Sequence, residues 1–455
     1  MKTAAWVLAL ILCAAPAWAM GSAPDRNPDR TSGGASRDVV EPKGVDLGLE
    51  QAYHLALRRN EDVAIGDEAV ERVKGDVWEA WGDGLGSIDY VYTDFRQDEQ
   101  GPSASSSTDG SSSVGGTLTS KTRSEGKLVI EQPIFRGLKE ISALQGAGSL
   151  HRQRLWEKKQ VRNDLFLEVA ASYYGLIRAR EDADTIERIL SLIGDRLNEL
   201  TEREKIGRSR PSERATASAR KKVIEADYAS AKGSLAIAEH RFVYFTGADP
   251  SQNNLADSGA EPPASPDAPA NAAETVEGRP DVEAVRAAME TARTAIAVKR
   301  TELFPTADLT ANLYNKREGF QKDIQWDLEF LFDIPVFDGG TSWGHWKKAL
   351  SDYETAKLVY ERTRRLAELD LKERWEEWVA SRDRYQALRD AVAESEENFK
   401  LQKDEYTHSL VSNLDVLSAL EDLLESQRNE ITARYEMKIN RWRYEISKGS
   451  CCESV

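Results

Sequence analysis

The chain of 455 residues lacks the features by which most membrane-spanning chains are recognised. After residue 19 it has no run of about 18 or more apolar residues, so the sequence predicts no transmembrane helix there. A chain without such a helix enters a membrane only as β-strands, because strands paired in a closed barrel also satisfy all their backbone groups.

Acidic residues outnumber basic ones, 77 to 61, and cysteine is scarce. The net charge of −16 disfavours nucleic acid as a partner, because phosphate binding needs a basic surface. Of the three cysteines, Cys451 and Cys452 are adjacent near the end of the chain and cannot form a disulfide framework. The five histidines are scattered, and no metal-binding or phosphate-binding motif occurs. We therefore expect no cofactor and no metal site.

The first residues have the pattern of an export signal. Lys2 precedes an apolar run, Ala4–Leu12, and a small-x-small site ends at Ala19. We expect a signal peptide over 1–19, an N-terminal extension over 20–44 and a C-terminal tail over 450–455. Lipid attachment at Cys13 is the less favoured alternative, because Leu12 before it is larger than the usual small residue.

Most of the sequence is an internal duplication. QPIFRG at 132–137 corresponds to IPVFDGG at 334–340, a step of 202 residues that holds through both C-terminal parts. Upstream the step is 219, which pairs Asp89 with Asp308. The difference lies in a Ser/Gly-rich stretch that reads as a loop. We assign repeat 1 to 45–247, a linker to 248–275 and repeat 2 to 276–449.

Each repeat is predicted to end in a long helical hairpin. No proline or glycine occurs between Gly344 and Gly449, and a helix over about 341–407 would be roughly 100 Å long. Mostly apolar residues follow coiled-coil spacing, which polar members of the seam make imperfect. In the second repeat they are Tyr385, Leu388, Val392, Ser395, Phe399, Gln402 and Tyr406; in the first, Leu190, Ile193, Leu197 and Leu200. The hairpins would turn at 205–213 and 407–415, here called the first and second tips.

Four strands are predicted, at about 86–97 and 124–135 in the first repeat and 305–315 and 323–336 in the second. Apolar residues alternate with polar ones, most clearly over 324–334, so each strand has one apolar and one polar face. The pattern fits an ordinary sheet with one wet face or membrane strands with apolar side chains towards lipid. Four strands do not close a barrel, so membrane strands would have to be shared between subunits; three copies would supply twelve.

Residues that permit sharp backbone changes stand where strands meet helices. They are Pro133, Gly137, Pro335, Gly339 and Gly340. Tryptophans gather at the same places, namely Trp78, Trp81, Trp343 and Trp346. Indoles favour the membrane–water interface, although packing within a helical core is the alternative. We therefore interpret these segments as joints between strands and helices.

These features together resemble the TolC-type outer-membrane efflux protein family. The resemblance covers about 45–449 and includes SNLDVLSA at 412–419 and YFTG at 244–247. It implies a mainly α fold with a small β part: a coiled-coil α-helical barrel continuous with a twelve-stranded transmembrane β-barrel shared by a homotrimer. It also implies outer-membrane location with the helices in the periplasm. The implied function is passive export, with a periplasmic adaptor and an inner-membrane pump or ABC transporter as partners.

The resemblance assigns roles to the two tips. Asp415 and Glu213 are candidates for an acidic ring at the periplasmic entrance, although Ser418 stands where some members have a second acid. Adaptor docking is expected at Gly207, Arg208, Arg210, Ser409 and Leu410. The alternative for Asp415 is that it only opposes its helix dipole. The alternatives for Arg208 and Arg210 are that they pair with these acids or only face solvent.

Two other functions fit parts of the sequence. GTSWG at 340–344 matches the nucleophile elbow of α/β-hydrolases, with Ser342 as nucleophile and His408 as the one well-separated histidine. The alternating strand before it is unlike the buried strand of such enzymes, so we expect no enzyme. A periplasmic coiled-coil adaptor or scaffold would explain the helices but not the alternating strands.

Overall fold

The computed structural model describes residues 46–96, 122–251, 254–255, 271–318 and 322–449, all within one compact unit, Gly44–Val455. The predicted signal peptide, N-terminal extension, Ser/Gly-rich loop and C-terminal tail lie outside the described residues.

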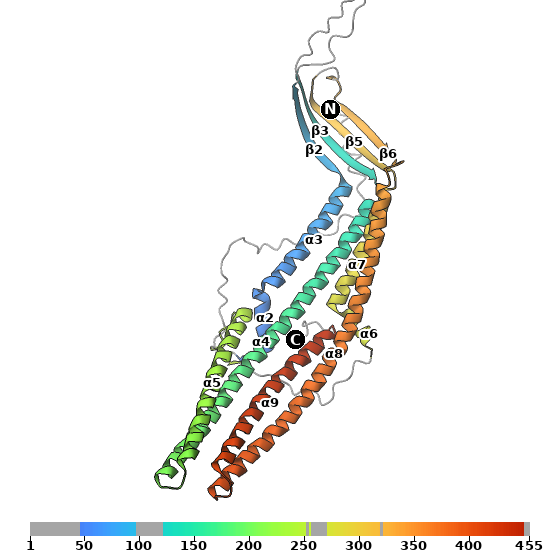
Figure 1. The fold of residues 1–455 in the computed structure, drawn as a ribbon. Coiled ribbons are helices and arrows are strands. Elements are labelled where there is room, and N and C mark those ends of the chain that lie inside the picture. The colour runs from blue at the N-terminus through green and yellow to red at the C-terminus, as the bar shows by residue number, and fades with distance from the viewer. Residues whose placement is uncertain (1–45, 97–121, 252–253, 256–270, 319–321, 450–455) are drawn as a thin grey trace, which may run out of the picture. The chain divides into compact units, whose positions relative to one another are not determined.

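The first repeat contains seven elements, most of which are labelled in Figure 1. They are β1 (Asp46–Leu47), α2 (Leu49–Arg59), α3 (Glu61–Leu85), β2 (Ser87–Arg96), β3 (Thr122–Phe135), α4 (Lys139–Lys205) and α5 (Pro211–Thr246). The second repeat contains α7 (Pro280–Thr301), β5 (Thr306–Arg317), β6 (Trp326–Asp333), α8 (Thr341–Thr407) and α9 (Asn413–Ser447). The predicted helix over 341–407 is confirmed as α8.

Short elements occupy the predicted linker. β4 (Asn254–Leu255) pairs in parallel with β1, and α6 (Ala272–Thr275) runs into a 3₁₀ turn, Val276–Gly278. Sequence reasoning missed β1 and β4, because a two-residue strand has no periodicity. The linker is therefore partly tied to the start of the first repeat.

The four longer strands form one antiparallel sheet in the order β2-β3-β5-β6 (Figure 1). The prediction that the last strand reaches 336 is wrong, because β6 ends at Asp333 and Pro335 follows outside it. A proline lacks the N–H that a ladder requires. Pro133, its counterpart, lies inside β3 at an irregularity in the pairing with β5.

Strand registers confirm the duplication residue by residue. β2 pairs Ile88 with Ile130 of β3, and adding the two steps gives Ala307 of β5 and Phe332 of β6, which are also paired. The same holds for every neighbouring pair from Ser87↔Glu131 to Asp94↔Ser124, which become Thr306↔Asp333 to Leu313↔Trp326. The two hairpins are therefore the same structure.

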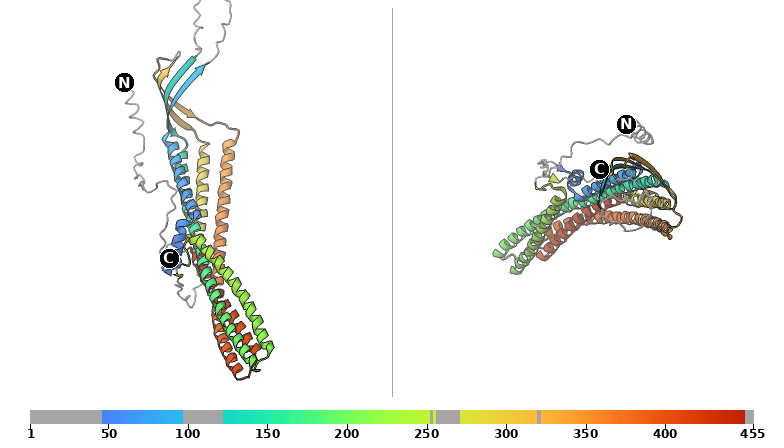
Figure 2. Two further views of the ribbon diagram at one scale, coloured as in Figure 1. Left: turned by 90° about the vertical axis from the view of Figure 1, so that its left-hand side faces the viewer. Right: turned by 90° about the horizontal axis from the view of Figure 1, so that it is seen from above.

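The long helices pack as predicted. α4 contacts α5, α8 contacts α9, and α4 also contacts α9 and α7; two views of the helices are given in Figure 2. Ile193 and Leu200 of the first seam are fully buried in one apolar cluster, against which Phe399 of the second seam packs. Ser395 of α8 shares a hydrogen bond with Ser426 of α9. The coiled-coil seams are thus the faces that join the helices.

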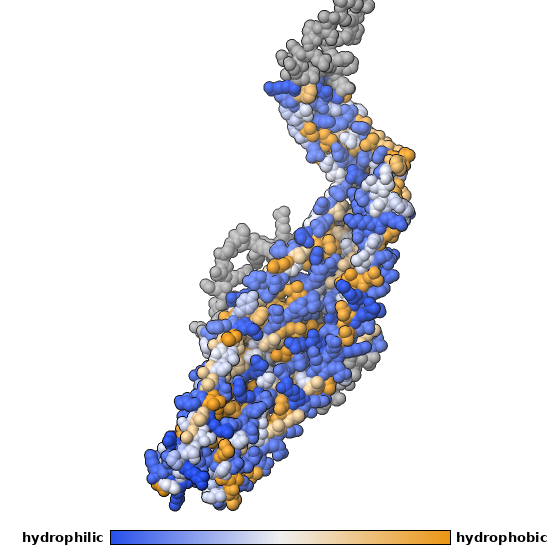
Figure 3. Space-filling view, in the orientation of Figure 1, coloured by the Kyte–Doolittle hydropathy of each residue, from blue (hydrophilic) through white to orange (hydrophobic). Residues whose placement is uncertain are grey.

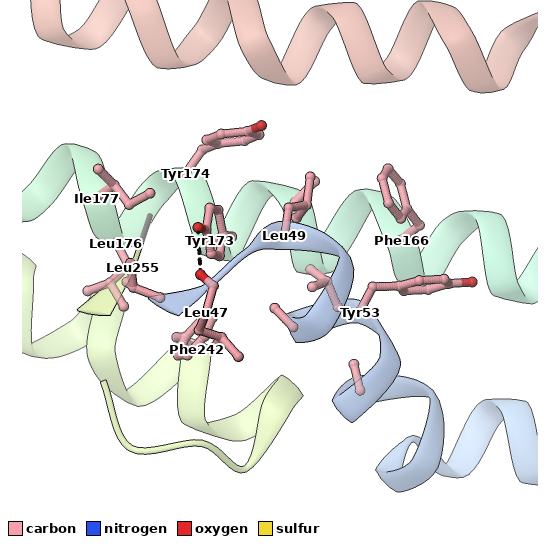
Figure 4. Close-up of a cluster of buried hydrophobic side chains, with 14 of the residues drawn as sticks. Leu47, Leu49, Tyr53, Phe166, Tyr173, Tyr174, Leu176, Ile177, Phe242 and Leu255 are labelled. Atoms are coloured by element: carbon pink, nitrogen blue, oxygen red, sulfur yellow. Dashed lines mark hydrogen bonds between the residues drawn. The ribbon is translucent and has the colours of Figure 1, made fainter. Parts of the chain in front are cut away.

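A second apolar cluster holds α2 against the middle of α4 (Figure 4). Tyr53 packs edge-on against Phe166, with ring centroids 5.2 Å apart. The hydroxyl of Tyr173 donates a hydrogen bond to the backbone oxygen of Leu47 at 2.9 Å. This cluster anchors the beginning of the described chain and β4 to the helical part.

Among the described residues, no helix combines the length and the apolar character that a membrane crossing requires.

Candidate functional site

The two tips have the same backbone. Gly207 and Ser409, which are repeat counterparts, both have left-handed conformations, with φ of 74° and 62°. The N–H groups of Arg208 and Leu410 donate to the carbonyls of Arg203 and Glu405, at 2.7 and 3.0 Å. This bond, together with one from the left-handed residue, forms a Schellman motif that ends α4 and α8. The left-handed state of Ser409 was not predicted, although its counterpart is glycine.

The candidate gate acids cap the helices that follow. Asp415 Oδ2 accepts the backbone N–H and the hydroxyl of Ser412, at 2.8 and 2.6 Å. Glu213 Oε2 accepts the hydroxyl of Ser209 at 2.5 Å and the backbone N–H of Arg210 at 3.4 Å. Each carboxylate reaches back from the third position of its helix to the N-cap, as in a capping box. Both acids therefore fix the start of a helix at a tip.

The hydrogen bonds also keep Asp415 ionised. Bonds from Ser412, its hydroxyl first and its backbone N–H second, lower the pKa of Asp415 below its usual value of 3.8. The side chain is exposed, so its charge faces solvent at the tip. An ionised, exposed carboxylate is what a charged entrance requires.

Arg208 and Arg210 stand apart from the other cations of the first tip. Arg203, Lys205 and Arg214 are each paired with an acid of the same chain. In the part of the chain that the structure describes, no ion pair involves Arg208 or Arg210, and both are exposed. Figure 3 shows mostly hydrophilic residues over the end of this hairpin. The exposed counterpart of Arg208 at the second tip is Leu410, 74% exposed.

Sequence reasoning missed a buried arginine that connects the tips. Arg196 of α4 is 8% exposed and donates from Nε to Oδ1 of Asn413, at 2.9 Å, at the start of α9. Its guanidinium carbon lies 3.7 Å from the centroid of the Tyr406 ring on α8, a cation–π contact. Arg196 thus holds the first hairpin to both helices of the second. In the sequence, the one sign of this role is that a cation stands next to the apolar seam, one residue before Leu197.

Ion pairs continue this connection along α4, α5 and α9. Asp182 of α4 accepts from Arg428 of α9 at 2.7 Å. Arg220 of α5 pairs with Glu421 of α9. Between these pairs lies a groove of about 570 Å³, with Asp227 and Glu425 also in its walls. The two hairpins are therefore joined by polar links and by an apolar seam, and these contacts would have to change if the tips separated.

The sheet has one polar face, as predicted. Asp327 of β6 accepts hydrogen bonds from Asn312 and Tyr314 of β5, both at 2.8 Å. At the other end of the same face, Arg136 donates to Asp308 at 3.0 Å. The opposite face carries apolar side chains that are exposed in the protomer. They include Ile88, Tyr90 and Tyr92 of β2 and Trp326, Leu328, Phe330 and Phe332 of β6.

The joints contain two successive left-handed residues each. In the first they are Gly137 and Leu138, with φ of 66° and 65°; in the second, Gly339 and Gly340, with φ of 72° and 90°. Glycine adopts these angles freely, whereas leucine does so at a cost. Asp338 caps α8 by accepting the N–H of Ser342 at 2.7 Å. The backbone changes direction in the same way at both joints.

All four predicted interface tryptophans lie beside the joints. Trp78 and Trp81 are near the end of α3 and are 71% and 41% exposed. Trp343 and Trp346 are in the first two turns of α8, with ring centroids 4.7 Å apart. The exposure of Trp78 and Trp343 argues against burial in the helical core of the protomer. A role at the membrane interface is a proposal.

Ser342 and His408 cannot act together as a catalytic pair. Ser342 lies in the first turn of α8 and His408 is the C-cap of the same helix, so roughly 100 Å separates them. The G-x-S-x-G match therefore has a structural meaning: its glycine and serine belong to the joint and to the capped start of α8.

The comparisons with known proteins agree with this geometry. Residues 272–443 match the family model described as outer membrane efflux protein. No curated protein matches the chain significantly in sequence.

Solved outer-membrane channels share the fold. The outer membrane protein VceC of Vibrio cholerae is 19% identical, with a TM-score of 0.73 over 89% of this chain and 97% of that one. The CmeC outer membrane channel of Campylobacter jejuni is 16% identical, with a TM-score of 0.76 over 88% and 85%. The MtrE outer membrane channel of Neisseria gonorrhoeae is 20% identical, with a TM-score of 0.71 over 90% and 92%. The family match and the shared fold together confirm the resemblance to the TolC-type outer-membrane efflux protein family.

Proposed function

We propose that this protein is the outer-membrane exit channel of a tripartite efflux or type I secretion system. One observation carries the proposal: a sheet with one polar and one apolar face continues directly into helices of 67 residues. In the outer membrane the apolar face would contact lipid and the polar face would line a water-filled pore. The helices would extend the pore into the periplasm.

The channel is a passive conduit assembled from three copies. The sheet of one protomer leaves β2 and β6 as edges, and lipid does not tolerate unpaired edges. Twelve strands from a homotrimer would close the barrel. Energy for transport would come from an inner-membrane pump or ABC transporter, to which a periplasmic adaptor would connect the helical tips.

The tips are the proposed entrance and docking surface. Asp415, with Glu213 beside the other tip, would give the entrance its negative charge. Arg208 and Arg210 are free for an acidic group of the adaptor, and Leu410 offers an apolar contact. Arg196, through Asn413 and Tyr406, would hold the two hairpins together in the closed state, and opening would shift packed helices against each other.

Planar-bilayer recording of the purified protein tests the channel. We expect discrete conductance steps, a trimer by native mass spectrometry, and loss of solubility when detergent is removed. A protein that is soluble and monomeric without detergent and gives no conductance would instead support the periplasmic adaptor or scaffold. The alternation of the strands and the exposed apolar face favour the channel.

A further inference from the structure

The starts of α3 and α7 are repeat counterparts, and the start of α7 holds a buried arginine. Arg279, the N-cap of α7, donates from Nε and Nη2 to the two carboxylate oxygens of Asp281, at 3.1 and 2.9 Å. Its Nη1 donates to Asp370 of α8 at 2.8 Å and to the backbone oxygen of Ser447 at 3.3 Å. The side chain of Arg279 is only 13% exposed. Two carboxylates, one from each helix, therefore hold a guanidinium where α7 begins.

The first repeat keeps both carboxylates but has no arginine there. The repeat steps take them to Asp62 of α3 and Glu168 of α4, whereas the arginine becomes Asn60. Asn60 turns back to its own helix, where its Oδ1 accepts the backbone N–H of Val63 at 3.0 Å. Asp62 and Glu168 are exposed, and within the described residues neither side chain has a hydrogen bond or an ion pair. The first repeat thus lacks the cation that its counterpart contains.

A pocket occupies the corresponding place. α3 and α4 lie side by side (Figure 1), and Asn60, Asp62 and Glu168 all line a pocket of about 340 Å³ between them. This volume lies at the lower end of the range for small-molecule sites, roughly 300–1,000 Å³. The rest of the wall is partly apolar and includes Ile65, Ala69, Val161 and Leu165. The pocket therefore combines two carboxylates with an apolar wall.

The other charged groups around the pocket leave it acidic. Its two cations are already paired, Arg154 with Glu157 and Lys158 with Asp67. Asp164 adds a further carboxyl group to the wall, and partial burial raises the pKa of this carboxyl above the usual value of 3.8. A cation bound beside these acids would stabilise their ionised forms.

We propose that the pocket between α3 and α4, here called the α3–α4 pocket, binds a small organic cation through Asp62 and Glu168. The second repeat supplies the reason, because the same two carboxylate positions bind the guanidinium of Arg279 there. A guanidinium presents N–H donors in a planar fork that matches carboxylate oxygens. The apolar wall accommodates a short hydrocarbon chain beside it, as it would the stem of an arginine side chain. The ligand class is therefore an alkylguanidinium.

The α3–α4 pocket is separate from the parts to which the channel function is assigned. It lies where α2 meets α3, at the end of α3 remote from the sheet. None of the residues that line it belongs to a tip or to a strand–helix joint. Its occupancy can therefore be measured on the purified protein whether or not the protein conducts.

Calorimetric titration of the purified full-length protein in detergent tests the pocket. The probe is n-butylguanidinium, with n-butanol as a neutral analogue and Mg²⁺ as an inorganic cation. We expect saturable binding of one n-butylguanidinium per chain and no saturable binding of n-butanol. Mg²⁺ requires a near-octahedral set of oxygen ligands, so we expect it to bind more weakly than the probe.

Single substitutions locate the binding. Asp62→Asn and Glu168→Gln each remove a charge and nearly keep the side-chain size, so we expect about tenfold weaker binding, or about 1.4 kcal/mol. Asn60→Arg gives the first repeat the residue of the second, and we expect its guanidinium to exclude the probe. Arg279→Asn is the reverse exchange, and we expect it to create a second site. Glu61→Gln changes an exposed acid that does not line the pocket and is the control.

Three results would overturn the proposal. The first is the absence of saturable binding to the wild type, which includes the case that a side chain of another chain already fills the pocket. The second is unchanged binding in Asp62→Asn and Asn60→Arg, which places the probe elsewhere. The third is tighter binding of Mg²⁺ that is lost in the same variants, which identifies a metal-ion site. Each leaves the proposed channel standing, because conductance in a planar bilayer is a separate measurement.

Discussion

The guanidinium of Arg196 lies over the ring of Tyr406, 3.7 Å from its centroid, although the two residues belong to different repeats. Its Nε bonds to Asn413 and its Nη1 pairs with Glu199 at 2.7 Å, while Nη2 has no hydrogen-bond partner among the described residues. Because Nη2 is unpaired, the buried guanidinium depends on its bonds through Nε and Nη1. It can hold the two hairpins together only while Asn413 and Glu199 stay in place.

Replacing Arg196 tests this connection. We expect Arg196→Met to loosen the tips, because Asn413 loses a buried donor at a cost of about 1–3 kcal/mol. Leak conductance in a planar bilayer should rise, and amide exchange near Asn413 should accelerate. The control is Asn398→Ala, at the exposed repeat counterpart on α8. If both variants and the wild type show the same leak conductance, Arg196 does not keep the tips closed.

The two readings of Asp415 are separable. Asp415→Asn removes the charge at the entrance, whereas Ser412→Ala removes a hydrogen bond of the cap and keeps the charge. If Asp415 belongs to the entrance, reversal potentials in a salt gradient should show lower cation selectivity in Asp415→Asn and wild-type selectivity in Ser412→Ala. Equal changes in both variants would mean that the carboxylate only caps α9.

A reciprocal exchange tests the turn geometry. Ser409 adopts a left-handed conformation that glycine adopts without strain, so Ser409→Gly should stabilise the second tip by about 1 kcal/mol. Gly207→Ser should destabilise the first tip by a similar amount. Hydrogen exchange of the tip amides measures both effects. Slower exchange in Gly207→Ser, or faster exchange in Ser409→Gly, would contradict the shared Schellman geometry.

The cap of α8 should persist in acid. Hydrogen bonds from Ser342 lower the pKa of Asp338 to about 2. Because the pKa is lower in the folded state, the stabilisation is complete above the ordinary value of 3.8 and is lost as pH falls towards 2. The emission of Trp343 and Trp346, measured as the difference from a variant with phenylalanine at both positions, should stay constant from pH 7 to 4.

Asp338→Ala provides the comparison for that titration. The variant lacks the cap at every pH, so its tryptophan emission at neutral pH should already differ from that of the wild type. A wild-type transition centred near pH 4 would show that the carboxylate of Asp338 has an ordinary pKa and that its bonds to α8 are weak.

The sequence predicts the regular parts well because each has a repeated signal. The absence of proline and glycine between Gly344 and Gly449 indicated a long helical segment. The repeat step placed the turn at 407–415, where α8 ends. The role of Arg196 was not predicted, because in the sequence a polar residue beside an apolar seam only weakens the periodicity. Nothing in that pattern indicates a contact with Asn413, 217 residues away. Ser409 escaped because serine has no backbone signature, and only its counterpart Gly207 reveals the left-handed turn.

At Pro335 the sequence pattern predicts more regular structure than the protein forms. Alternation continues through Ile334, so the pattern extends the strand further than the hydrogen bonds do. Its counterpart Pro133 lies within β3, where the partner strand β5 compensates with an irregular register. The same residue type therefore follows the end of one strand, β6, and lies within the other, β3.

The identical registers of the two hairpins also bear on the origin of the architecture. A chain of half this length, with one hairpin and one helical arm, would already present both kinds of edge and would close the same ring with twice as many copies. In a single chain that contains both halves, the two copies need not be identical. Arg196 and its counterpart Asn398 differ in this way, since one is a buried cation and the other an exposed amide.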